Sequence, residues 1–181
     1  ILINGSILPD EELIENITKL KNNQALVCRN DMIALRLTQD KTEAFRNNAL
    51  GDINCIEYQN NNLIKINHPW EIFINNGWAI EEDFRLLTKN RESASLSSTN
   101  QILGTNPIFL EPGAQVECAT LNTTNGPVYI GRGAEVMEGS VIRGPLALGE
   151  HSVLKMSSKI YGPTTLGPYC KLGGEVNNSI L

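Results

Sequence analysis

The sequence is short of basic residues, histidines and cysteines, and each shortage excludes a class of protein. Fifteen Lys and Arg stand against twenty Asp and Glu, which gives a formal net charge of -5. The basic residues are scattered and form no stripe that could bind a nucleic-acid backbone. The four cysteines form no CxxC pair and have no His at ligand spacing, so no zinc site is expected. No apolar run approaches the ~18 residues of a membrane span. We therefore expect no nucleic-acid partner, no membrane partner and no metal site built by these residues.

The isolated cysteines are typical of small buried side chains in a reducing compartment. The first residues also lack the pattern of a signal peptide. We therefore expect a cytoplasmic protein. The chain starts at Ile1 without a Met and ends at Leu181 within a repeat, so we expect it to be a piece of a longer protein.

Residues 1–89 alternate short apolar runs with amphipathic segments, which predicts a small α/β segment. Pro9 and the acidic residues after it favour a helix start, and Leu13, Ile17 and Leu20 follow at helical spacing. Residues 26–29 and 32–37 predict two strands joined by a turn. Residues 42–49 predict a short helix. Residues 55–58 and 63–66 predict a second hairpin that turns at residues 60–62.

A longer helix is predicted from Pro69 onward, because apolar residues follow at spacings of three and four. We assign this stripe to core packing and not to a cofactor-binding aromatic cluster, and the sequence leaves open whether residues 75–77 split the helix. The Ser-rich residues 90–105 then predict a linker. The expected domains are 1–89, which includes this linker helix, 90–105, the linker, and 106–181. The stripe consists of Trp70, Phe73, Gly77, Ile80, Phe84 and Leu87.

The last segment, residues 106–181, carries an internal repeat of six residues. Large aliphatic residues recur without a miss, and four positions after each stands a mostly small residue. A second repeat lies on top of the first: GPVYIG at 126–131 returns as GPLALG at 144–149 and as GPTTLG at 162–167. The aliphatic residues are Ile130, Val136, Ile142, Leu148, Leu154, Ile160, Leu166 and Leu172.

Both periods fit a coil with three flat faces that repeats every eighteen residues. Each face directs one large aliphatic side chain inward, and Gly and Pro serve the corners, where the chain takes a positive or a fixed φ. Stacked coils place Ile130, Leu148 and Leu166 in one interior ladder. A looser copy at residues 110–116 precedes Ile130 by twenty residues, so we expect a two-residue bulge at residues 120–125. The segment therefore predicts a parallel β-helix.

These hexads resemble the left-handed parallel β-helix of the hexapeptide-repeat transferases. The handedness comes from that resemblance, since the spacing fits either hand. The whole chain resembles bacterial sugar nucleotidyltransferases related to the bifunctional N-acetylglucosamine-1-phosphate uridylyltransferase/glucosamine-1-phosphate acetyltransferase. The resemblance implies a mainly β fold, with a C-terminal left-handed parallel β-helix after a small α/β segment and a linker helix. It also implies that residues 1–89 are the remnant of an α/β nucleotidyltransferase-like domain with its linker helix.

The resemblance also implies substrates, cofactors and assembly. The expected substrates are a sugar phosphate or a nucleotide sugar, and acetyl-CoA would serve an acyl transfer at the β-helix. The sequence holds no G-x-G-T-R phosphate loop, so Mg²⁺ would enter only with a nucleotidyltransferase domain outside these residues. Related transferases assemble as homotrimers, and Val141, Met156 and Tyr161 are apolar residues left for such a contact. We expect the 181-residue chain alone to be inactive.

Three residues are candidates for a site. His151 could act as a general base, because the pKa of an ordinary histidine suits proton transfer near neutral pH, although a structural role at a coil corner is the simpler interpretation. Arg143 and Lys171 lack an opposite charge one coil away and could bind a sugar phosphate or a coenzyme A phosphate. Arg132 stands eighteen residues before Glu150, so those two are expected to pair between coils.

Two classes of function remain open at this point. The first is part of a sugar-phosphate or sugar-nucleotide transferase of cell-envelope precursor synthesis, with nucleotidyl transfer, acyl transfer or both. The second is a non-catalytic β-helix that serves as an oligomerisation or regulatory module. The fold alone does not choose between them, because function depends on sites and not on the scaffold.

Overall fold

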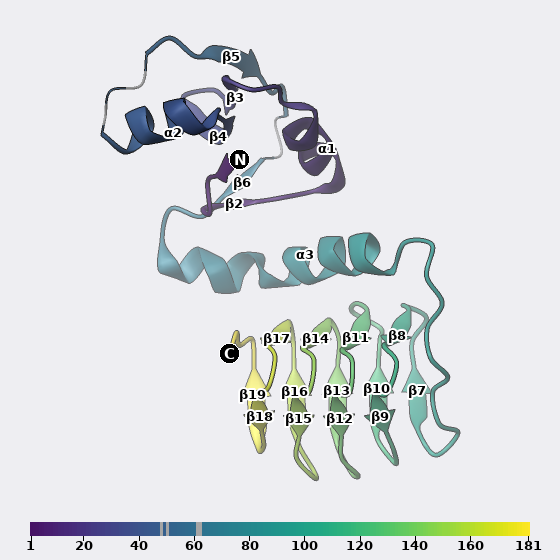
Figure 1. The fold of residues 1–181 in the computed structure, drawn as a ribbon. Coiled ribbons are helices and arrows are strands. Elements are labelled where there is room, and N and C mark those ends of the chain that lie inside the picture. Colours follow the sequence, from purple (N-terminus) through teal and green to yellow (C-terminus); the bar gives the residue numbers. More distant parts are fainter. Residues whose placement is uncertain (48, 50, 61–62) are drawn as a thin grey trace. The chain divides into compact units, whose positions relative to one another are not determined.

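The computed structural model describes residues 1–47, 49, 51–60 and 63–181 (Figure 1). The chain forms two compact units, Ile1–Asn67 and His68–Leu181. The sequence had suggested a boundary after residue 89, but the structure places the long helix with the second unit. The two units are described separately below.

The first unit contains a four-stranded sheet and a two-stranded sheet. The larger sheet has the order β1-β4-β3-β5, in which β3 pairs antiparallel with β4 and parallel with β5. The smaller sheet pairs β2 with β6 in antiparallel fashion. The expected hairpin of residues 26–37 is confirmed. The strands are β1 (Leu2–Ile3), β2 (Ile7–Leu8), β3 (Gln24–Cys28), β4 (Asp31–Arg36), β5 (Asn54–Glu57) and β6 (Ile64–Lys65).

The second expected hairpin is wrong, because β5 and β6 join different sheets. Its turn residues Asn61 and Asn62 lie outside the described residues. Local sequence shows where a strand can form, but its partner is set by the packing of the whole unit, here by the pairing of β5 with β3.

Two helices complete this unit, α1 (Glu11–Lys19) and α2 (Gln39–Arg46). The start of α1 follows from its cap, because Asp10 Oδ1 accepts a hydrogen bond from the Leu13 amide at 2.8 Å. Leu13 and Ile17 on α1 are buried, as their helical spacing predicts. They belong to a core that also contains Ile7, Leu20, Leu26, Cys28, Ile33, Ala34 and Tyr58.

The second unit contains a parallel β-solenoid of about four turns, which confirms the expected architecture (Figure 1). Three parallel sheets form its faces, and we name each by its first and last strand. The β7–β19 sheet comprises β7 (Gln101–Leu103), β10 (Thr120–Asn122), β13 (Val141–Arg143), β16 (Lys159–Tyr161) and β19 (Glu175–Asn177). The β8–β17 sheet comprises β8 (Ile108–Leu110), β11 (Val128–Ile130), β14 (Leu146–Leu148) and β17 (Thr164–Leu166). The β9–β18 sheet comprises β9 (Gln115–Val116), β12 (Glu135–Val136), β15 (Val153–Leu154) and β18 (Lys171–Leu172).

The interior ladder follows the predicted register. Ile130 pairs with Leu148, and Leu148 pairs with Leu166 in the next coil. All three side chains are at most 1% exposed. The small residues four positions later also face inward, since Ala134 and Ser152 are fully buried. At about 1.5 to 3 kcal/mol for each buried aliphatic side chain, this ladder is the main source of stability in the unit.

The looser first coil is confirmed, but its irregularity is larger than a two-residue bulge. Leu110 pairs with Ile130 and Val116 pairs with Val136, as the twenty-residue offset predicts. Five residues, 123–127, connect β10 to β11, whereas two residues connect β13 to β14. Three residues connect β9 to β10, whereas four connect β12 to β13. The first connection is three residues longer than in later coils and the second is one residue shorter. The sequence repeat therefore shows only the net excess of two residues.

The repeated glycines are required by close contact between coils more than by backbone angle. A Cβ on Gly149 would lie 2.6 Å from the backbone carbon of Gly167. A Cβ on Gly131 would lie 2.7 Å from the backbone nitrogen of Glu150. These distances are far below van der Waals contact, so only glycine fits in this column. The expectation that corner glycines serve a positive φ holds at other positions, such as Gly162, with φ of 63°.

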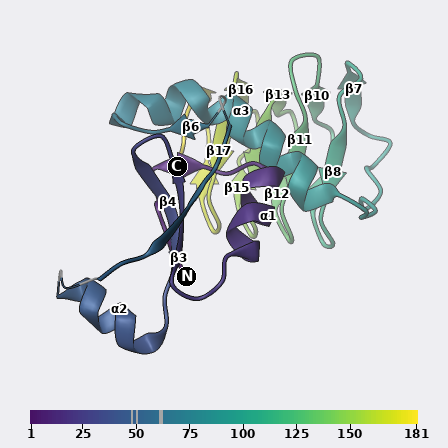
Figure 2. The same cartoon turned by 90° about the horizontal axis from the view of Figure 1, so that it is seen from above.

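The helix α3 (Pro69–Thr88) lies along the outer face of the β8–β17 sheet (Figures 1 and 2). It is a single helix, so residues 75–77 do not split it. Asn76 explains why: its Nδ2 donates to the Pro163 carbonyl at 3.0 Å, and its Oδ1 accepts from Thr165 Oγ1 at 2.8 Å. The neighbouring Gly77 allows this approach, since a Cβ there would lie 3.1 Å from Pro163 Cγ.

Only some residues of the apolar stripe of α3 are buried. Ile80 and Phe84 are buried, whereas Trp70 and Phe73 are 60% and 44% exposed. The core-packing interpretation therefore holds for Ile80 and Phe84 but not for the two ends of the stripe, since Leu87 is 47% exposed as well. The Ser-rich segment after it contacts the solenoid too, because the Ala94 amide donates to the Leu110 carbonyl at 2.8 Å. Residues 101–103 of the expected linker form β7, so the first coil begins earlier than residue 106.

We expect Leu148→Asp to destabilise the solenoid by more than about 4 kcal/mol, because the carboxylate would have no partner in the interior ladder. Glu150→Ala is the control, with an expected change below about 0.5 kcal/mol, because its exposed side chain points outward. Urea unfolding followed by circular dichroism measures both. Equal losses would contradict the interior position of Leu148.

We expect Asn76→Ala to weaken the attachment of α3 by about 1 to 3 kcal/mol, because two partly buried hydrogen-bonding groups of the solenoid lose their partner. Asn75→Ala is the matched control, since the Asn75 side chain bonds only to the Glu71 carbonyl in its own helix. Hydrogen exchange of the α3 amides would report the difference. Similar exchange in both variants would show that Asn76 does not hold the helix.

Candidate functional site

His151 lies at a corner of the solenoid, after β14, with its side chain exposed. Its ring stacks on that of Tyr169 in the next coil, with 5.2 Å between the ring centroids. Its backbone has a φ of 55°, and the equivalent positions Gly113, Gly133 and Tyr169 also have positive φ, between 61° and 79°. A corner with left-handed backbone and a stacking partner accounts for this histidine structurally. Its role as a base stays a prediction.

The two predicted phosphate-binding residues lie on different faces. Arg143 is on β13 in the β7–β19 sheet, and Lys171 is on β18 in the β9–β18 sheet. Both are exposed, and neither has a hydrogen bond or ion pair within the described part of the chain. The structure does not bring these two residues and His151 together in one chain.

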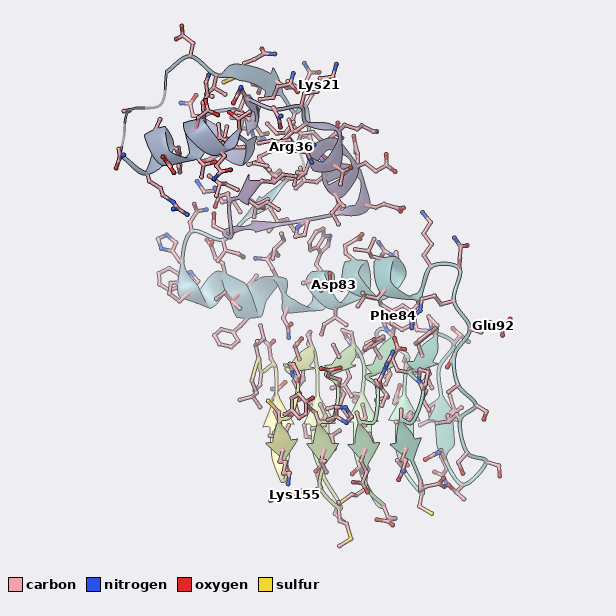
Figure 3. All side chains as sticks on the ribbon, viewed as in Figure 1. Lys21, Arg36, Asp83, Phe84, Glu92 and Lys155 are labelled. Atoms are coloured by element: carbon pink, nitrogen blue, oxygen red, sulfur yellow. The ribbon has the colours of Figure 1, made fainter. Side chains whose placement is uncertain are left out.

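The most structured polar cluster is one that the sequence did not single out. Glu111 is buried at the end of β8, and each carboxylate oxygen has its own partner. Arg91 Nη2 lies 2.6 Å from Oε2, and Tyr129 Oη donates to Oε1 at 2.7 Å. Arg91 also lies over the ring of Phe109, 5.3 Å from its centroid. Figure 3 draws the side chains on α3 and on the solenoid as sticks.

The same contacts set the ionisation of the cluster. The Arg91 hydrogen bond, with help from Tyr129 and against the cost of burial, lowers the pKa of Glu111 below its ordinary value. Burial, and then the hydrogen bond to the Glu111 carboxylate, raises the pKa of Tyr129 to about 12. At neutral pH the cluster is therefore an ion pair with a neutral phenol.

A polar pocket of about 310 Å³ adjoins this cluster. The side chains of Arg132 and Glu150 are both exposed at the pocket. They stand one coil apart, yet no ion pair between them is formed, which differs from the expected pairing. The pocket is lined by Glu111, Tyr129, Gly131, Arg132 and Glu150.

A second cavity, of about 220 Å³, lies between α3 and the β8–β17 sheet. Its walls are mostly apolar, with Ala79, Phe84 and Leu87 on the helix and Ala147 on the sheet. Asp83 lines it as well, and Figure 3 labels Asp83 and Phe84 on this helix. Asp83 remains exposed at the surface, but partial desolvation and the neighbouring Glu82 raise the pKa of its carboxyl.

One signal in the sequence could have revealed Glu111. Leu110 pairs with Ile130, so Glu111 occupies in the first coil the position that Gly131, Gly149 and Gly167 occupy in later coils. An acid in a glycine column is unusual because the column has no room for a side chain between coils. In the structure, the Glu111 carboxylate is bound by Arg91, which follows α3, and by Tyr129 of the next coil.

Over the described ranges, no group of three His, Cys, Asp or Glu is arranged to hold a metal ion. The helices within those same ranges are too short or too polar to cross a membrane. The polar cluster thus offers hydrogen bonds and charge but no metal-ligand set.

We expect the stability of the solenoid unit to fall as the pH drops below about 4.5, the ordinary pKa of Glu111. The folded-state pKa is lower than the unfolded one, so the stabilisation is present above that value and is lost as pH falls through the folded pKa. The urea midpoint measured against pH should lose part of this acid dependence in Glu111→Gln. Glu150→Gln is the control and should keep it. An unchanged acid limb in Glu111→Gln would contradict the role of the cluster.

Comparison with known proteins now adds a family. A sequence model described as sugar nucleotidyl transferase matches residues 1–92. No curated protein and no solved structure matches the chain. The matched segment ends one residue after Arg91, so it includes the whole of α3 and the arginine that binds Glu111. It covers 92 of 181 residues, just over half, and the chain therefore belongs to the sugar nucleotidyl transferase family.

Proposed function

We propose that the protein takes part in nucleotidyl transfer to a sugar phosphate, in the synthesis of cell-envelope precursors. The substrates of this reaction would be a sugar phosphate and a nucleoside triphosphate, and its product a nucleotide sugar. The single observation that carries the proposal is the family match over residues 1–92. The resemblance of the hexads to those of hexapeptide-repeat transferases supports it.

The matched segment and the solenoid share a compact unit. This arrangement supports the proposal that they are parts of a single enzyme and not two independent modules. The matched segment contributes α3, and α3 belongs to the same compact unit as the solenoid. Buried contacts of Asn76 and the ion pair of Arg91 with Glu111 fix this arrangement. A helix built into the solenoid in this way is a part of the fold and not a flexible tether.

Acyl transfer from acetyl-CoA at the solenoid is the second candidate activity. In this proposal His151 serves as the base, and Arg143 and Lys171 bind phosphate groups. Because these residues lie on different faces of one chain, a shared site would need neighbouring copies. Val141 and Tyr161, 45% and 40% exposed on the β7–β19 sheet, and Met156, 66% exposed near its edge, support a homotrimer. Such an assembly without catalysis is the scaffold alternative.

The four cysteines are free thiols, and this favours a reducing, cytoplasmic location. Mg²⁺ would bind with the triphosphate, and the described residues show no ligand set for it. The G-x-G-T-R loop that would hold the triphosphate is not found among residues 1–181. The solenoid unit therefore supplies assembly or sugar binding in this proposal, and other residues supply the triphosphate site.

The test is pyrophosphate release from each of the four nucleoside triphosphates with Mg²⁺ and a sugar 1-phosphate. It is run on the 181-residue chain and on a version carrying whatever further residues its gene encodes. We expect release from the longer version and none from the chain alone, because the chain offers no glycine-rich amides around a triphosphate. Release from neither version, over a panel of sugar 1-phosphates, would contradict nucleotidyl transfer and favour the scaffold.

Acetyl-CoA turnover with glucosamine 1-phosphate tests the second candidate activity, acyl transfer, independently of nucleotidyl transfer. Loss of turnover in His151→Ala, with turnover kept in His68→Ala, would assign the base to the solenoid corner. His68 is the matched control because it precedes α3 at the start of the unit, away from the coil corners. Equal turnover in both variants would exclude His151 as the base.

A further inference from the structure

The two cavities of the solenoid unit adjoin each other. Tyr129 lines both of them, and the consecutive residues Gly149 and Glu150 line one each. The smaller cavity is apolar and the larger one is polar. A ligand that spans both must therefore carry an apolar end and a polar end.

The polar part is suited to hydroxyl groups. The Glu111 carboxylate is already saturated by Arg91 and Tyr129, so it offers little free charge. Arg132 can donate and Glu150 can accept hydrogen bonds, and within the described residues neither side chain has a hydrogen bond or ion pair, although the charge of Arg132 also acts on Glu111. One cation and one anion side by side leave the pocket close to neutral. This favours an uncharged polyol over a phosphate, which would be repelled by the carboxylates.

The apolar part is suited to a short aliphatic chain. Ala79 and Ala147 face it from the helix and the sheet, and their small size leaves the space open. Phe84 and Leu87 complete the wall on the helix side. A volume of about 220 Å³ accommodates a few methylene groups but no large ring system. Asp83, at its edge, has no hydrogen-bond partner within the described part of the chain and can accept one from a ligand hydroxyl.

We propose that the two adjoining cavities of the solenoid unit together bind a small uncharged polyol that carries a short aliphatic chain. The polyol lies in the pocket of Arg132 and Glu150, and the chain lies against Ala147 under the helix. This inference goes beyond the proposed transfer reaction and does not depend on it, because the site lies on the solenoid unit and its ligand carries no phosphate.

The probes are butyl β-glucoside and methyl β-glucoside, titrated into the ¹⁵N-labelled 181-residue chain. Butyl glucoside should shift the amide resonances of Gly131 and Gly149. It should bind at least tenfold more tightly than methyl glucoside, since each methylene buried in the groove is worth about fourfold in affinity. Equal affinities, or shifts confined to another part of the unit, would overturn the proposal.

Variants separate the two halves of the site. Ala147→Leu fills the groove and should abolish the preference for the butyl chain while methyl glucoside binds as before. Val153→Leu is the matched control, because it adds apolar bulk to the outer face of the same coil but on the β9–β18 sheet. Glu150→Gln should weaken both probes, and Glu135→Gln, on β12, should weaken neither.

Folding of each variant is checked through the Asn76 side-chain amide resonance, which reports whether α3 is still docked. A docked Ala147→Leu variant that keeps the full butyl preference would refute the groove as the chain-binding part. The pyrophosphate assay gives an independent result. Nucleotidyl transfer without glucoside binding would refute only this inference, and binding without transfer would refute only the proposed function.

Discussion

The structure of the solenoid unit depends on stacking each coil directly over its equivalent in the next. Backbone hydrogen bonds between coils hold Leu148 above Ile130 and below Leu166, so the interior is a column of aliphatic side chains. The same close stacking leaves no room for a Cβ at Gly131 or Gly149. A side chain at either position would overlap the backbone of the next coil, so polar side chains are excluded from these two positions.

The polar cluster includes the first residue of this glycine column. Glu111 stands in the glycine column at the end where β8 is the outermost strand of its sheet. Its carboxylate would be costly to bury alone, and Arg91, which follows α3, supplies the compensating charge. The chain thus ends its long helix close to the coil whose Glu111 forms an ion pair with Arg91. The helix in turn covers the outer face of the sheet and forms one wall of the apolar cavity, which adjoins the polar pocket.

Much of the fold could be predicted from the sequence because its repeats are local. Eight aliphatic residues at a spacing of six and three copies of GPxx[I/L]G specify the coil, its three faces and the ladder. The helix starting at Pro69 was also predictable from its spacing. The pairing of β5 with β3 was not, because no local pattern in residues 54–57 identifies a partner some thirty residues earlier.

The candidate site was the least predictable part, because its members are far apart in the sequence and lie at or after three different elements. Arg91 follows α3, Glu111 comes directly after β8, and Tyr129 lies in the middle of β11. Sequence reasoning favoured Arg143, Lys171 and His151 because they were unpaired charges or a titratable ring. The structure shows that packing one element against another, rather than unpaired charge, concentrates polar groups in this unit.

The left-handed corner column has a consequence for how this surface can change. Gly113, Gly133, His151 and Tyr169 share a backbone conformation that side chains other than glycine adopt only at some cost in strain. His151 and Tyr169 recover part of that cost by stacking on each other. Replacement of either ring leaves the other with strain and no compensation, so the free-energy effects of the two replacements should not add. The stability contribution of His151 therefore depends on Tyr169, eighteen positions later in the sequence, although no local pattern links the two residues.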